Sequence, residues 1–233
     1  MSQKRLLIDI QSVSHSIDHW DEKYCYYYNS NEANMKEGHV LILGVENSPY
    51  FGGFYFFQNI FPDTYPFAPP KWTFLSNDGK TRFNPNLYQF NGQGKVCLSI
   101  LNTWGESTWS QVQRFSSVIE TVRAHLFHDK PLINEPGYKE TDPMNAIYSR
   151  MLYYQNLNFN VYHNIVKTPE YALPFKQIMI ENFKINKDYF KKYIDDNKHY
   201  HGKTESITYD SQKVTYDFDT LEKKYEEIIL ACN

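Results

Sequence analysis

The chain has 233 residues, enough for one large domain or two small ones built on a hydrophobic core. Its net charge is -3, from 24 basic and 27 acidic residues, which gives no sequence-wide basic surface for nucleic acid or an anionic membrane. No apolar run approaches the roughly 20 residues that span a bilayer, and the N-terminus turns polar too soon for a secretory signal. We therefore expect a soluble intracellular protein that binds neither nucleic acid nor membranes.

The cysteine content excludes two further classes. Cys25, Cys97 and Cys232 are widely spaced and odd in number, a pattern typical of neither a disulfide framework nor a zinc site. No metal is expected, and at least one cysteine is a candidate for a free, working thiol. The 19 lysines against 5 arginines indicate an AT-rich coding sequence, as in a large DNA virus or an AT-rich protist.

The first third of the chain predicts a helix followed by an antiparallel meander. Apolar residues recur every three or four positions over residues 5–19, which predicts an amphipathic helix. Short aromatic or β-branched segments separated by turn residues then predict four strands, over residues 24–28, 39–45, 54–60 and 71–75. Four prolines between the third and fourth strands forbid helix and ladder pairing there and predict a stiff, extended loop.

The middle of the chain predicts a long irregular segment and then a helix. Residues 76–107 show no helical or strand period and are too many for an ordinary connector, so this segment is a candidate to carry function. Ser110 is a candidate N-cap for a helix whose apolar face runs to Leu126.

The C-terminal part predicts more helices. Helical patterns cover residues 143–166 and 171–195, whereas residues 199–209 are polar and predict a loop. Asp219, with Glu222 three residues later, predicts the N-cap of a last helix over residues 221–230.

Cys97 lies in the most informative stretch. Two glycines let the backbone turn tightly just before the thiol. From the residues alone, a cysteine between Val96 and Leu98 fits core packing at least as well as chemistry. A cysteine hydrolase would need a base, and no histidine stands in a recognisable signature with Cys97.

Several motifs in register resemble the core of ubiquitin-conjugating enzymes. They are Tyr65-Pro66-Phe67-Ala68-Pro69-Pro70-Lys71, Asn84-Pro85-Asn86, Gly94-Lys95-Val96-Cys97-Leu98-Ser99-Ile100-Leu101, Trp104 and Trp109-Ser110. Asn134-Glu135-Pro136-Gly137-Tyr138 further resembles the long-chain branch that includes the enzyme charged by the second, alternative ubiquitin-activating enzyme. The resemblance is dense over residues 38–137.

The resemblance implies an α+β structure, the UBC fold. Its expected parts are an N-terminal helix, a four-stranded antiparallel meander sheet, an active-site loop and further helices. The expected domains are a ubiquitin-conjugating core over residues 1–166 and a helical C-terminal extension over residues 167–233 that packs on the core.

The resemblance also implies an acyltransferase. Cys97 would accept the C-terminal glycine of ubiquitin, or of a ubiquitin-like protein, from an activating enzyme as a thioester and pass it to a substrate lysine or a ligase. The thiolate would attack an acyl group that is already activated, so a moderately exposed thiol suffices without a histidine base. No cofactor is implied, because the activating enzyme consumes the ATP. The implied setting is the cytoplasm or nucleus of a eukaryotic cell, a host cell if the gene is viral.

Two asparagines before Cys97 are implied to serve the site. Asn86 matches the family residue that stabilises the oxyanion or holds the active-site loop, although a turn-former beside Pro85 is the alternative. Asn84 replaces the family's histidine, and we expect altered loop packing there. About three residues more than the family's usual spacing separate Asn86 from Cys97, inserted around residues 89–93, which leaves the reach of Asn86 open.

A carboxylate near the lysine entry is the next implied feature. Asp129 is the candidate, since a carboxylate can orient or deprotonate an incoming amine. The alternatives are that Asp129 is a solvated acid at a helix end, and that neighbouring His128 serves instead or merely caps the helix.

Further residues are implied to bind protein partners. The ligase-binding residues are Phe67 in the proline loop and Trp109, Ser110, Gln111 and Val112 in a second loop. Core packing is the alternative for the two aromatic residues. Lys4 and Arg5 would lie on the docking face for the activating enzyme, or would simply be a solvated basic start of a helix.

One alternative function from a different class stays open. A non-catalytic scaffold on the same fold could bind ubiquitin or a ligase. Asn84 and the longer loop favour it, whereas the retained Cys97 opposes it.

Overall fold

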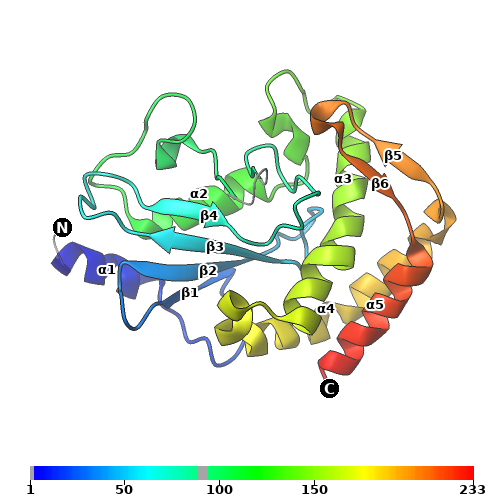
Figure 1. Cartoon of the computed structure of the whole chain (residues 1–233), viewed down its shortest axis with the longest axis horizontal. Coiled ribbons are helices and arrows are strands. Elements are labelled where there is room, and N and C mark those ends of the chain that lie inside the picture. The colour runs from blue at the N-terminus through cyan, green and yellow to red at the C-terminus, as the bar shows by residue number, and fades with distance from the viewer. Residues whose placement is uncertain (1–2, 89–93) are drawn as a thin grey trace.

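A computed structural model of the chain describes residues 3–88 and 94–233 (Figure 1). The insertion predicted around residues 89–93 therefore lies outside the described residues. Helix α1 is followed by four antiparallel strands in the order β1-β2-β3-β4, and then by further helices. The predicted α+β class and meander are confirmed. The bounds of this part are α1 Gln3–Val13, β1 Tyr26–Ser30, β2 Glu37–Leu43, β3 Phe54–Ile60 and β4 Lys71–Phe74.

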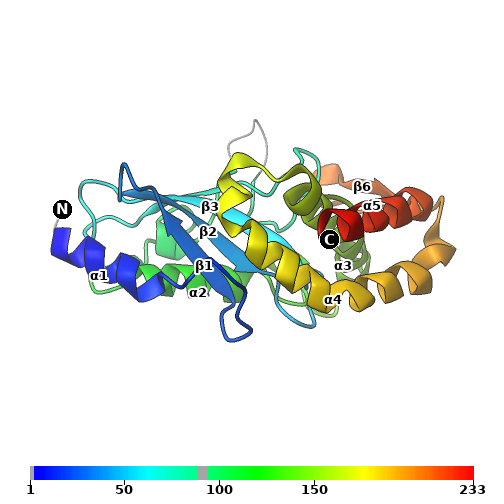
Figure 2. The same cartoon turned by 90° about the horizontal axis from the view of Figure 1, so that it is seen from below.

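Strand β3 is buried on both faces, which explains its unbroken aromatic run. On one face, Phe57 contacts the rings of Phe74 and Phe127, at the end of helix α2 (Phe115–Leu126). On the other face, Phe56 packs against Tyr171 and Phe175 of the 3-10 segment η6 (Glu170–Phe175). Figure 2 shows η6 and the start of α4 (Lys176–Asn197) lying over the strands. The C-terminal part of the chain thus completes the second layer of the core.

Helix α1 is shorter than predicted. It ends at Val13, and the expected continuation to residue 19 is wrong. The Ser12 and Ser14 hydroxyls donate to backbone carbonyls of their own turn, and the Ser16 hydroxyl accepts from the amide of Asp18. Such local hydrogen bonds compete with the helical ladder and end the helix.

Helix α2 also begins later than predicted. Its N-cap is Arg114, and residues 110–113 form a turn in which Gln113 N donates to Ser110 O at 3.0 Å. The Arg5 guanidinium donates to the carbonyls of Gln111 and Gln113, which keeps both out of a helical ladder. A long-range contact therefore overrides the N-cap preference of Ser110.

Buried asparagines join the following helices to the start of β3. Helix α3 (Met144–Gln155) continues through the π-helical segments η4 (Asn156–Val161) and η5 (His163–Lys167). Asn160 accepts from Phe54 N at 2.6 Å and donates to Phe54 O at 2.9 Å, and Asn164 donates to the same carbonyl. Asn156 donates to Phe51 O. The four-residue spacing places the three amides on one helical face, where they satisfy backbone groups at the strand end.

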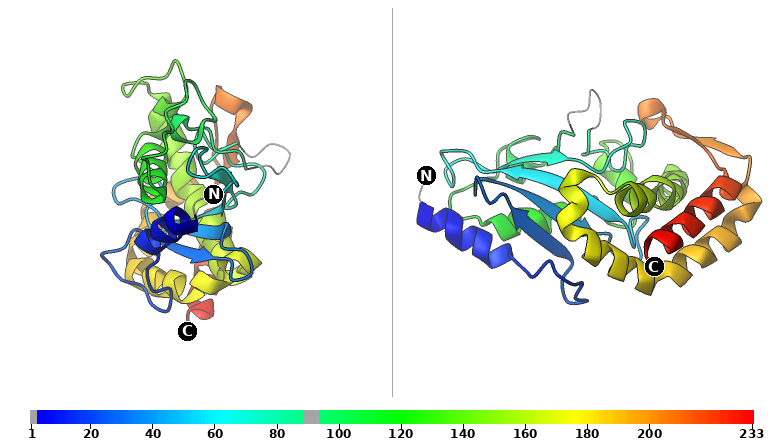
Figure 3. Two further views of the ribbon diagram at one scale, coloured as in Figure 1. Left: turned by 90° about the vertical axis from the view of Figure 1, so that its left-hand side faces the viewer. Right: turned by 60° about the horizontal axis from the view of Figure 1, so that its bottom comes forward.

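The C-terminal extension contains a hairpin that the sequence did not predict. Strands β5 (Thr204–Ser206) and β6 (Lys213–Thr215) pair antiparallel within and beyond the stretch expected as a loop. Helix α5 (Phe218–Ala231) follows, and its N-cap is Asp217, whose carboxylate accepts from Thr220 N at 3.0 Å. The predicted cap at Asp219 is wrong by two residues. Figure 3 shows α5 beside α4.

The hairpin reaches the core next to the irregular segment. The Gln212 side-chain oxygen accepts from Arg82 N at 2.9 Å, and the Asp210 carboxylate lies 3.4 Å from the Arg82 guanidinium. Arg82 in turn donates to Pro85 O at 2.7 Å. The extension is therefore packed on the core, although the boundary at residue 166 remains a prediction. Within the described ranges, no helix is long and apolar enough to cross a membrane.

Candidate active site

The backbone around Cys97 is fixed by pairing with the segment before it. Val96 and Leu87 form an isolated antiparallel bridge, and Cys97 N donates to Asn86 O at 2.8 Å. The 3-10 segment η2 (Ser99–Leu101) follows at once. The cysteine thus lies between a paired residue and a helical turn, with its position set on both sides.

A hollow of about 310 Å³ opens beside this cysteine, and we call it the Cys97 hollow. It combines polar amides, hydroxyls and one imidazole with an apolar wall. Its lining residues are Asn86, Cys97, Leu98, Ser99, Trp104, Thr121, His125, Ile133 and Asn134. The two residues predicted to carry the chemistry, Cys97 and Asn86, therefore share one cavity.

Cys97 is almost completely buried. Its exposed fraction is 2%, less than that of the moderately exposed thiol that would suffice for thioester exchange. The neighbours Val96 and Leu98 are also buried, so the segment is held in the core and the thiol borders the hollow instead of the open surface.

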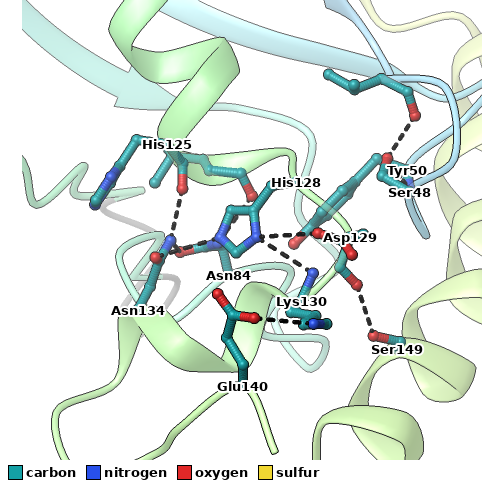
Figure 4. A network of polar contacts seen from close by, with 12 residues as sticks. Ser48, Tyr50, Asn84, His125, His128, Asp129, Lys130, Asn134, Glu140 and Ser149 are labelled. Carbon is teal, nitrogen blue, oxygen red and sulfur yellow. Dashed lines mark hydrogen bonds and ion pairs between the residues drawn. The ribbon is translucent and has the colours of Figure 1, made fainter.

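Asn84 is a structural residue of the loop that carries Asn86 (Figure 4). It is fully buried, and its amide donates to Leu126 O at 2.9 Å. Its side-chain oxygen accepts from Asn86 N at 2.8 Å and from the Asn134 side chain at 3.2 Å. This pattern agrees with the expectation that Asn84 acts on loop packing.

Two buried tyrosines support the residues just before Asn84. The Tyr50 hydroxyl donates to Phe83 O, and the Tyr148 hydroxyl donates to Arg82 O. Burial raises the pKa of both phenols far above the ordinary value, so both remain neutral donors. The loop thus enters the site with its carbonyls already satisfied.

Asn86 is buried and held through its backbone. Its backbone N–H donates to the Asn84 side-chain oxygen, and its backbone carbonyl accepts from the backbone N–H of Cys97. The backbone is thereby occupied on both sides, and the residue lines the Cys97 hollow. Its role in the chemistry remains a prediction.

Asp129 lies outside the lining of the Cys97 hollow. Its side chain is 65% exposed, its carboxylate is 3.9 Å from Nδ1 of His128, and its carbonyl accepts from the Ser149 hydroxyl. His128 Nδ1 accepts from Lys130 N, and its Nε2 is 3.4 Å from the Asn134 side-chain oxygen. Figure 4 shows His128 and Asp129 on the turn after α2. Asp129 therefore remains a candidate without a place in the hollow.

His125 is a lining residue that the sequence reasoning missed. Among the nine described lining residues, only Cys97 and His125 have titratable side chains. Burial, and to a smaller extent the charge of His128, lower the pKa of His125 below its ordinary 6.5. Thr121 and His125 are four residues apart, hence on one face of α2, and this polar pair beside the apolar stripe was the available signal.

The two predicted ligase-binding loops are joined, and each presents one exposed apolar side chain. Phe67 is 76% exposed and Val112 is 77% exposed. Trp109 is buried in the core, and its indole nitrogen donates to Pro66 O at 2.8 Å. Core packing therefore applies to Trp109 and not to Phe67. The backbone N–H of Ser110 donates to the side-chain oxygen of Gln113, within the second loop.

Arg5 connects helix α1 to the second of these loops. Its Nε donates to Asp9 at 2.6 Å, and its other nitrogens donate to the carbonyls of Gln111 and Gln113. Asp9 is fully buried and also accepts from the Tyr65 hydroxyl in the proline loop. Arg5 is thus a structural link between α1 and both loops, whereas its neighbour Lys4 is exposed.

Comparisons with known proteins identify the family of the chain. A family model described as ubiquitin-conjugating enzyme matches residues 10–160. The chain belongs to the ubiquitin-conjugating enzyme family. It is 31% identical over 194 residues to human ubiquitin-conjugating enzyme E2 Z, with 81% of this chain and 53% of that protein covered. This match supports the predicted resemblance to the long-chain branch.

Two further comparisons extend the match. Probable ubiquitin-conjugating enzyme protein 17 of Caenorhabditis elegans is 31% identical over 186 residues, covering 76% of this chain and 25% of that protein. The crystal structure of a putative ubiquitin conjugating enzyme from Plasmodium yoelii is 22% identical, with a TM-score of 0.50 over 67% of this chain and 94% of that one, and is similar in fold. The chain spans about half or less of these two curated relatives.

Proposed function

We propose that this chain is an active ubiquitin-conjugating enzyme that carries its modifier as a thioester on Cys97. The observation that carries the proposal is that Cys97 and Asn86 line one hollow in a chain of this family. In the first step the Cys97 thiolate attacks the thioester carbonyl presented by the activating enzyme. A new sulfur–carbon bond forms, the old one breaks, and the thiol of the activating enzyme leaves.

The second step transfers the acyl group to a lysine amine. A nitrogen–carbon bond forms, the Cys97 sulfur–carbon bond breaks, and one proton must leave the amine. The Asn86 amide is a neutral donor beside Cys97, so it can stabilise the oxyanion of the tetrahedral intermediate. Loss of one such donor costs on the order of 3 kcal/mol in other enzymes.

We assign the proton acceptor of this step to His125. The described residues that line the hollow include no carboxylate, and Asp129 is not among them. Burial keeps His125 neutral near pH 7, so that its imidazole can take up the proton of the attacking amine. The His125 imidazole on α2 would then be the general base of the transfer step.

The partners follow from the same proposal. They are ubiquitin or a ubiquitin-like protein, an activating enzyme of the alternative type, ubiquitin ligases and protein substrates. The exposed side chains of Phe67 and Val112 would contact the ligase. We propose that the chain needs no cofactor of its own, since ATP is consumed by the activating enzyme.

A charging assay tests this function. The chain is mixed with activating enzyme, ATP and ubiquitin, and the products are separated with and without a thiol reductant. We expect a reductant-sensitive adduct for the wild type, a reductant-resistant ester for Cys97→Ser and no adduct for Cys97→Ala. An adduct that survives Cys97→Ala contradicts the assignment of the nucleophile.

A non-catalytic scaffold is the second candidate, and the burial of Cys97 favours it. A scaffold would bind ubiquitin or a ligase without forming a covalent adduct. The charging assay, run with both ubiquitin-activating enzymes and several ubiquitin-like proteins, separates the two. Binding without any adduct across the whole set supports the scaffold.

A further inference from the structure

Asn134 lies at the meeting point of three segments around the Cys97 hollow. It is the last residue of the 3-10 segment η3 (Pro131–Asn134), and it lines the hollow itself. Its side-chain nitrogen donates to His125 O at 2.8 Å, on the last turn of α2, and to Asn84 Oδ1 at 3.2 Å. Both amide hydrogens are thus used, one on the helix and one on the active-site loop (Figure 4).

A continuous series of hydrogen bonds runs from Asn134 to Cys97. Asn84 Oδ1, which accepts from Asn134, also accepts from Asn86 N at 2.8 Å. Asn86 O then accepts from Cys97 N at 2.8 Å. Because Asn84 is fully buried, its oxygen has no water to replace a lost partner.

We propose that Asn134 is a positioning residue for the active site, which holds the backbone of Asn86 and Cys97 at a fixed place relative to His125. This inference rests on the proposed function and deepens it. Asn134 makes no bond in the reaction. Its amide sets the distance between the loop that carries the acyl group and the helix that carries the base, and small errors in such distances slow a reaction greatly.

The proposal separates two properties that a purely structural residue would change together. A lost hydrogen bond lowers stability wherever it lies. Only a bond that positions the reacting groups also lowers the rate at saturating acceptor, with little change in the acceptor concentration for half-maximal rate. The comparison therefore needs an asparagine of similar bonding that lies away from the hollow.

Asn145 provides this matched control. It is buried near the start of α3, and its side-chain nitrogen likewise donates two hydrogen bonds, to the backbone carbonyls of Lys139 at 2.7 Å and Asp142 at 3.3 Å. It does not line the hollow. We expect Asn145→Ala to lower thermal stability as much as Asn134→Ala does.

The test is single-turnover discharge of a preformed ubiquitin thioester to free lysine, or to free cysteine if the wild type reacts only with thiols. We expect Asn134→Ala to lower the rate at saturating acceptor about tenfold or more, and Asn145→Ala to leave it within about twofold of the wild type. Asn134→Asp keeps the shape but turns an oxygen toward each acceptor, so it should be at least as slow as Asn134→Ala. Equal rates for Asn134→Ala and Asn145→Ala overturn the proposal.

Three outcomes would count against the proposal or against the proposed function. If Asn134→Ala and Asn134→Asp both fail to fold while Asn145→Ala folds, Asn134 is a residue of general stability and the proposal is overturned. If the wild type itself takes up no ubiquitin, the proposed function fails. A wild type that charges and discharges, beside an Asn134→Ala variant that matches it, refutes the positioning role alone.

Discussion

Replacement of Asn84 by alanine gives the sharpest stability prediction. The side chain is fully buried and takes part in three hydrogen bonds, to Leu126 O, Asn86 N and the Asn134 amide. Each such bond contributes about 1 kcal/mol net, and the buried partners left behind add a desolvation cost. We therefore expect Asn84→Ala to lower the free energy of unfolding by about 3 kcal/mol.

Urea unfolding, followed by tryptophan fluorescence, measures this change. Asn186→Ala is the matched control, since Asn186 is half-buried on α4 and donates chiefly to Asn182 of its own helix. We expect the control to lose less than about 1 kcal/mol. A loss for Asn84→Ala no larger than that of the control would refute the structural role given to Asn84.

Three further predictions concern the loops, the base and the hairpin. Phe67→Ala and Val112→Ala should each lower ligase-stimulated discharge about tenfold, without changing charging or the melting temperature, because both side chains are exposed; an unchanged ligase response would contradict it. The pKa of His125 is lowered, so its free base dominates at neutral pH, and wild-type discharge to lysine, after correction for protonation of the lysine amine itself, should fall only at a pH below 6.5. His125→Gln should be about 100-fold slower at neutral pH and should lose this additional fall, and an unchanged corrected pH profile would exclude His125 as the base. Asp210→Ala should cost about 1 to 2 kcal/mol of unfolding free energy because it removes a partner of the buried Arg82, whereas the hairpin control Lys213→Ala should cost almost nothing; equal losses in a urea titration would argue against this contact.

The strands, and the nearness of Cys97 to Asn86, could be predicted because their signals are local. The run Phe54–Ile60 is aromatic and bounded by turn residues, so its strand was clear from the sequence. Cys97 and Asn86 were proposed from short motifs that resemble those of ubiquitin-conjugating enzymes, and both line one hollow in the structure. Signals of this kind need no knowledge of distant residues.

The missed features depend on contacts between distant segments. The start of α2 is decided by Arg5, more than one hundred residues earlier, which holds the carbonyls of Gln111 and Gln113. Asp9 is one polar residue within the predicted first helix, yet it is fully buried, where Arg5 and Tyr65 donate to its carboxylate. Neither partner is visible from the local pattern.

The places of His125 and Asn134 at the hollow were hidden for a related reason. His125 comes to the hollow because α2 packs along the sheet, and Asn134 reaches it through a separate 3-10 segment. No spacing in the sequence links these residues to Cys97. The hairpin of the extension was likewise hidden, because its strands are only three residues long and polar.

The most direct test of the central claim is to locate the covalent bond itself. The Cys97→Ser variant is charged with activating enzyme, ATP and ubiquitin, the stable ester is digested with trypsin, and the peptides are sequenced by mass spectrometry. Our account predicts a Gly-Gly remnant of ubiquitin on residue 97. A remnant on any other residue, with residue 97 unmodified, would contradict it.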